Sequence, residues 1–100
     1  MAEVSVKFVG VLRDVTGGRR TVVDLGEDAS LTDLLAALHR RYGQRFGESV
    51  LSGPNGVKGH VKLFLNGREI DRRDLSTTRV VVEGVAAQAI LYVVPSTAGG

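Results

Sequence analysis

Cysteine is absent from this chain of 100 residues, and its absence removes several kinds of chemistry. Disulfide bonds, a thiolate nucleophile, iron–sulfur clusters and cysteine-ligated zinc all require thiol side chains. If the protein handles sulfur, that sulfur cannot be carried on one of its own cysteines.

Long apolar segments are missing as well. No stretch approaches the roughly 20 apolar residues that a membrane-spanning helix needs. The first seven residues lack the basic leader and apolar run of a secretory signal. We therefore expect a cytoplasmic protein with no membrane partner.

Positive charge is not concentrated in any part of the sequence. Lys and Arg number 13 against 11 Asp and Glu, which gives a formal net charge of +2. The basic residues include three separate pairs, Arg19-Arg20, Arg40-Arg41 and Arg72-Arg73. Nucleic-acid binders more often gather such residues into a patch or stripe, so we do not expect a nucleic-acid partner.

What is present has the composition of one small folded domain, with 43% hydrophobic and 24% charged residues. Period-two alternation predicts four main strands, over residues 4–9, 20–25, 61–65 and 89–94. Thr16-Gly17-Gly18 predicts a short turn, so the first two strands are expected to form a hairpin. Asn66-Gly67 predicts a second tight hairpin, with 68–70 as its short return strand.

The segment from Leu31 to Tyr42 carries the strongest helix signals. Ser30 and Asp33 form a capping-box pattern, and Gly43 supplies the stop. One apolar stripe recurs at helical spacing, at Leu31, Leu34, Leu35, Leu38 and Tyr42. Acidic residues precede this helix and two arginines lie in its last turn, as the helix dipole favours.

Two further segments are less regular. Residues 43–60 contain five glycines and predict a long, partly packed connection, from which Phe46, Val50 and Leu51 fold back onto the core as a short turn or helix. Residues 80–85 are either a strand or a packed loop. The last strand is apolar on both faces, which places it in the middle of a sheet or under another surface. The element order predicts an α+β fold, a mixed sheet of four to five strands packed on one main helix.

The domain itself offers no catalytic constellation. His39 and His60 lie in different predicted elements with no motif around them, and we interpret both as surface residues. The glycines do not form a phosphate-binding loop with a following Lys and Ser or Thr. No pattern predicts a metal site or a bound cofactor. The group left as a candidate for chemistry is the carboxylate of Gly100.

Gly99 and Gly100 end the sequence shortly after the last predicted strand. Without side chains, such a terminus can enter a narrow active site, although a frayed end gives the same pattern. Pro95 ends the strand because it cannot donate to a ladder. We therefore predict a domain over residues 1–95 and a flexible tail over 96–100, in which Thr97 and Ala98 can line a partner's channel.

Four segments together resemble the β-grasp, ubiquitin-like fold, and more narrowly the bacterial sulfur-carrier proteins. That family includes the small subunit of molybdopterin synthase and the sulfur carriers of thiamine and cysteine biosynthesis. The segments are Val4-Ser5-Val6-Lys7-Phe8, Leu12-Arg13-Asp14-Val15-Thr16-Gly17-Gly18, Leu65-Asn66-Gly67-Arg68-Glu69-Ile70 and Tyr92-Val93-Val94-Pro95-Ser96-Thr97-Ala98-Gly99-Gly100. One stretch departs from many relatives, because Glu83-Gly84-Val85-Ala86-Ala87-Gln88 replaces an acidic turn before the last strand.

The resemblance implies a cycle in which the protein is a co-substrate rather than an enzyme. A partner adenylating enzyme uses MgATP to convert the carboxylate of Gly100 into an acyl-adenylate. A persulfide or sulfide donor then replaces the nucleotide and leaves a thiocarboxylate. A biosynthetic enzyme finally accepts the sulfur.

Such a cycle needs a surface on which the partner docks. Alternation places Val9, Phe64, Tyr92 and Val94 on the sheet face opposite the helix, and we interpret this face as the docking patch. The alternative is that the connection over residues 43–60 covers it. Two other functions stay open: a ubiquitin-like modifier joined through Gly100 to a lysine amine, and a β-grasp module that binds RNA or another partner without chemistry at its tail.

Overall fold

The computed structural model of the protein describes residues 2–53, 56–82 and 87–93. Strand β1 (Ala2–Gly10) and strand β2 (Arg20–Leu25) pair antiparallel, as predicted. The link between them is not the short turn that the glycines suggested, because helix α1 (Leu12–Thr16) lies there. Leu12 is fully buried and anchors this helix to the core, and Gly17 ends it with φ of 75°.

Helix α2 (Leu31–Tyr42) has the predicted bounds. The Ser30 side chain accepts a hydrogen bond from the Asp33 backbone N–H at 3.2 Å, and the Asp33 carboxylate accepts one from the Ser30 N–H at 2.9 Å. Its buried stripe consists of Leu31, Leu34, Leu35 and Leu38. Tyr42 lies at its far end, with its ring edge-on to Phe8 at a centroid distance of 5.7 Å.

The long connection folds back onto the core as predicted, and it does so as a helix followed by a small hairpin. Helix α3 (Gln44–Val50) buries Phe46 and Val50 completely. Strands β3 (Leu51–Ser52) and β4 (Gly56–Val57) then pair antiparallel, and Leu51 packs against the core. Residues 43–53 and 56–60 therefore extend the helical layer.

The second predicted hairpin is also present. Strand β5 (Val61–Leu65) and strand β6 (Arg68–Glu69) pair across a turn in which Asn66 and Gly67 have φ of 51° and 85°. Positive φ at both positions is what a type I′ turn requires. The 3₁₀ helix η1 (Arg72–Asp74) follows. Beyond it lies a loop in which Val80 is buried. The Val80 N–H donates a hydrogen bond to the Ala29 carbonyl at 3.0 Å.

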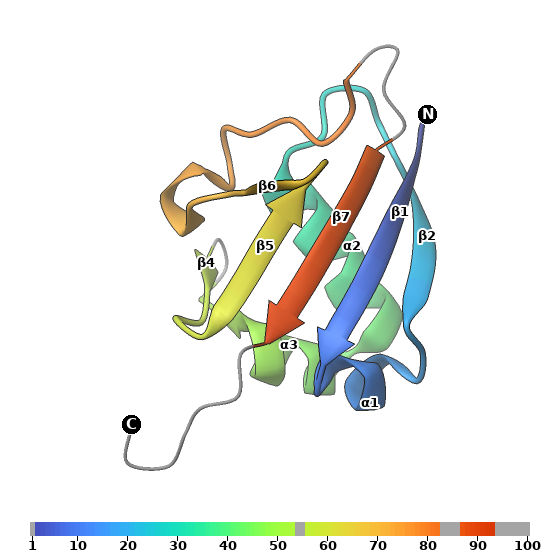
Figure 1. The fold of residues 1–100 in the computed structure, drawn as a ribbon, viewed down its shortest axis with the longest axis vertical. Helices are drawn as coiled ribbons and strands as arrows, with labels where there is room; N and C mark the ends of the chain where they lie inside the picture. The colour runs from blue at the N-terminus through green and yellow to red at the C-terminus, as the bar shows by residue number, and fades with distance from the viewer. Residues whose placement is uncertain (1, 54–55, 83–86, 94–100) are drawn as a thin grey trace.

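Strand β7 (Ala87–Val93) is the central strand of a five-stranded mixed sheet with the order β2-β1-β7-β5-β6. It runs parallel to β1 and antiparallel to β5. Figure 1 shows helices α2 and α3 together behind this sheet, and the core lies between the two layers. The predicted α+β architecture is thus confirmed, with five strands on one main helix and two shorter helices beside it.

Candidate docking face and C-terminal reactive group

The predicted reactive residue, Gly100, lies outside the described residues, as do Gly99, Ala98, Thr97 and Val94. The same is true of Glu83 to Ala86, most of the segment that departs from the sulfur-carrier pattern. The division into a domain over 1–95 and a tail over 96–100 therefore stays a prediction. The structure does describe the strand that leads toward this end of the sequence.

Strand β7 is held in the sheet up to its last described residue. Val93 is paired with Gly10 of β1 on one side and with Val61 of β5 on the other. Because β7 and β1 are parallel, the C-terminal ends of both strands lie at the same end of the sheet, near helix α1 (Figure 1). The central strand of the sheet, paired on both sides, thus precedes the predicted tail in the sequence.

Three of the predicted docking residues lie together on the sheet face opposite the helices. Val9 is the register partner of Tyr92, and Phe64 is the register partner of Ile90. All four of these side chains are half-buried. Sequence reasoning missed Ile90, although its spacing of two residues from Tyr92 on the same strand was the available signal. We call Val9, Phe64, Ile90 and Tyr92 the apolar quartet.

The helical layer leaves this face open within the described part of the chain. The connection that could have covered it, residues 43–53 and 56–60, contributes Phe46, Val50 and Val57 to the core on the helix side. Val22, at the β2 edge of the open face, is 48% exposed. On the β5 side, an ion pair borders the quartet. In this pair, Lys62 Nζ lies 3.4 Å from Glu69 Oε2.

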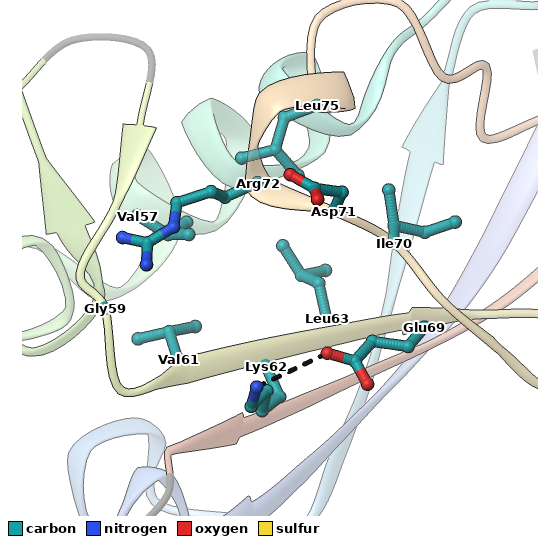
Figure 2. A pocket seen from close by; sticks show the side chains of 10 residues that line it. All are labelled: Val57, Gly59, Val61, Lys62, Leu63, Glu69, Ile70, Asp71, Arg72 and Leu75. Atoms are coloured by element: carbon teal, nitrogen blue, oxygen red, sulfur yellow. Dashed lines mark ion pairs between the residues drawn. The ribbon is translucent and has the colours of Figure 1, made fainter.

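A separate hollow of about 210 Å³ lies at the edge of the sheet, between β5, β6 and η1 (Figure 2). Apolar side chains form much of its wall: Val57, Val61, Leu63, Ile70 and Leu75. Its charged groups are Lys62, Glu69, Asp71 and Arg72. Asp71 caps η1, and hydrogen bonds from Arg73 lower the pKa of this carboxyl from its ordinary value. The hollow places charged groups over a small apolar floor but brings no nucleophile and base together.

The histidines do not form a site either. His39 on α2 and His60 before β5 are both exposed, as the sequence indicated. Across residues 2–53, 56–82 and 87–93, no three His, Cys, Asp or Glu side chains gather as metal ligands would. No helix in this part of the chain is long and apolar enough to span a membrane.

Comparison with known proteins gives a sequence relative that spans nearly the whole chain. The chain is 31% identical to small archaeal modifier protein 3 of Haloferax volcanii over 98 residues, which cover 98% of this chain and 99% of the relative. No protein-family model matches the sequence.

Solved structures share the fold. The crystal structure of small archaeal modifier protein 1 of H. volcanii matches with a TM-score of 0.78 and 20% identity, covering 95% of this chain and all of that one. A putative molybdopterin converting factor, subunit 1, from Pyrococcus furiosus matches with a TM-score of 0.73 and 20% identity, covering 95% and 100% of the two chains. These likenesses confirm the β-grasp, ubiquitin-like fold.

Proposed function

The chain belongs to the family of small archaeal modifier proteins, and from this premise we propose that it is a sulfur carrier whose reactive group is the carboxylate of Gly100. In this proposal the protein is a co-substrate. A partner enzyme supplies the active site, the ATP and the magnesium ion, and this chain supplies the acyl group.

The observation that carries the proposal is the position of β7. This central strand contributes Ile90 and Tyr92 to the apolar quartet and continues in the sequence to Gly100. The seven residues after Val93 span at most about 24 Å when extended. A partner docked on the quartet would therefore have its active site within reach of the terminal carboxylate.

The chemistry takes place at the carbonyl carbon of Gly100. An oxygen of its carboxylate attacks the α-phosphorus of ATP, pyrophosphate leaves, and an acyl-adenylate forms. Sulfide attacks the carbonyl carbon, AMP leaves, and a thiocarboxylate forms directly. A persulfide donor attacks the same carbon and displaces AMP to give an acyl disulfide. A second thiol of the donor then cleaves this acyl disulfide, so that the thiocarboxylate is released and the donor is left as a disulfide. The resulting thiocarboxylate is a sulfur nucleophile that needs no cysteine, which suits a chain that has none.

The partners in this scheme are an adenylating enzyme, a sulfur donor and a sulfur-accepting biosynthetic enzyme. We propose that Val9, Phe64, Tyr92 and Val94, joined by Ile90, bind the first of these. Because ATP and the donor are cytoplasmic metabolites, we place the protein in the cytoplasm. The chain itself would bind no cofactor.

A second candidate function is protein modification, and the printed name of the H. volcanii relative, a modifier protein, favours it. The same acyl-adenylate would then be attacked by a lysine amine of another protein. Activation at Gly100 is common to both functions, whereas the nucleophile in the second step separates them.

The intact mass of the protein tests the proposal. The full chain is incubated with ATP, its adenylating enzyme and a sulfide donor, and the variant lacking Gly100 serves as the control. A sulfur carrier gains the mass difference between sulfur and oxygen, and the shortened variant gains nothing. Isopeptide conjugates without any sulfur gain would favour the modifier function, and sulfur gain by the shortened variant would contradict both.

A further inference from the structure

Two cross-strand pairs on the open sheet face bring like charges together. Lys7 lies directly opposite Arg20, and Glu3 lies directly opposite Asp24, in the register of β1 and β2. All four side chains are exposed. Like charges at directly opposed positions destabilise a sheet, so this arrangement works against the stability of the isolated protein.

Arg13 and Arg19 add to the positive end of this face. Lys7, Arg13 and Arg19 line one shallow hollow of about 320 Å³, together with Phe8 and Val9. Arg13 and Arg19 also line an adjoining, wider hollow beside Gly10, Gly17 and Gly18, in which Asp14 is the one carboxylate. We call Lys7, Arg13, Arg19 and Arg20 the basic rim.

Within the part of the chain that the structure describes, no ion pair neutralises the basic rim. The ion pairs found in residues 2–53, 56–82 and 87–93 are Lys62–Glu69, Arg73–Asp71 and Arg79–Asp28, and none involves a residue of the rim. In the two hollows that the rim lines, the carboxylate of Asp14 is therefore the one negative charge near the four positive charges of the rim. An acidic surface brought against them would relieve the repulsion between Lys7 and Arg20.

The rim also has a definite place relative to the predicted tail. Lys7 and Val9 are next to each other on the open face of β1, and Val9 is the register partner of Tyr92. The rim thus flanks the apolar quartet at the end of the sheet where β1 and β7 finish, while Glu3 and Asp24 lie toward the end where β1 begins. The separation of positive and negative side chains along this face would fix the orientation in which a partner docks.

We propose that the basic rim binds an acidic protein surface beside the entrance to the adenylating enzyme's active site, which deepens the function proposed above and rests on it. The quartet supplies apolar contact, and the rim steers the encounter so that the end of β7 faces the entrance. A protein partner fits better than a nucleic acid because the rim is continuous with apolar side chains, and because Asp14, Glu3 and Asp24 would repel a phosphate backbone.

Charge reversal at two rim residues tests this surface. The variant Arg19→Glu/Arg20→Glu is compared with Arg40→Glu/Arg45→Glu, which changes the net charge equally on exposed residues of α2 and α3. Association of each full chain with the organism's own adenylating enzyme is followed at increasing NaCl. Thermal unfolding checks that both variants fold, and Arg19→Gln/Arg20→Gln provides a milder rim variant.

We expect the rim reversal to lower the association rate constant at least about tenfold at low ionic strength, and the control reversal to change it far less. The difference should disappear near 1 M salt, where the Debye length is only about 3 Å. Equal effects of the two reversals, or none, would overturn the proposal. So would tight binding of a mixed-sequence single-stranded RNA that the rim reversal abolishes while enzyme association is unchanged.

Failure of the rim proposal can be distinguished from failure of the proposed carrier function. If the wild-type chain gains sulfur and the rim variant associates normally, the rim proposal fails and the carrier function stands. If the rim variant associates poorly and the wild-type chain never gains sulfur, the rim proposal stands and the carrier function fails.

Discussion

Asn66 joins two parts of the sheet through its backbone and its side chain. Its N–H donates to the Gln88 carbonyl at 2.9 Å, and its Oδ1 accepts from the Gln88 N–H at 3.0 Å. Its φ of 51° is one that asparagine tolerates better than most residues. One residue thus closes the β5–β6 turn and fixes the start of β7, the strand that leads toward Gly100.

Replacing Asn66 with alanine is expected to lower the free energy of unfolding by about 1–2 kcal/mol, because the side-chain acceptor is lost and the left-handed conformation becomes less favourable. Urea unfolding measures the change. Asn66→Asp keeps the acceptor and should lose much less. Equal losses in the two variants would show that the bond to Gln88 contributes nothing.

Gly99 is predicted to act through the absence of its side chain. Gly99→Val adds a branched side chain next to the reactive carboxylate, and a displaced carboxylate should slow adenylation by about 100-fold. Pyrophosphate release with the adenylating enzyme reports this rate. The same substitution at Ser96, farther from Gly100, should have a much smaller effect. An unaltered rate for Gly99→Val would argue against a narrow channel.

Among the elements, the strands of the open sheet face are predicted to contribute most of the free energy of binding to the adenylating enzyme. Phe64→Asp places a carboxylate in the apolar quartet, next to Ile90, and should weaken binding to the adenylating enzyme at least about tenfold. Calorimetry measures the affinity. Val22→Asp lies on the same face at the β2 edge, and it should leave binding nearly unchanged. A similar loss in both variants would mean that the quartet has no special role.

The elements also show which structure the sequence could predict. Helix α2 was predictable because its cap, apolar stripe and stop are all local signals. Helix α1 was missed because a helix of five residues has little stability of its own and depends on the burial of Leu12. Period-two alternation correctly placed Val9, Phe64 and Tyr92 on one face. The charge pairing of Lys7 with Arg20 depends on strand register, which the sequence does not give.

For the molecule as a whole, the buried cluster among the described residues extends from Val4 to Leu91 and so lies within the predicted domain. Deleting residues 96–100 should therefore change the free energy of unfolding by no more than about 0.5 kcal/mol. Thermal and urea unfolding check this. A large loss of stability would contradict the predicted division into a domain over 1–95 and a tail over 96–100.

The location of the acquired sulfur shows whether the carboxylate of Gly100 is the reactive group. After reaction with ATP, the adenylating enzyme and a sulfide donor, the full chain is fragmented in the mass spectrometer. One oxygen should be replaced by sulfur in the fragments that contain Gly100, and fragments ending before Gly100 should keep their original mass. Sulfur in any other fragment, or none at all, would contradict that assignment.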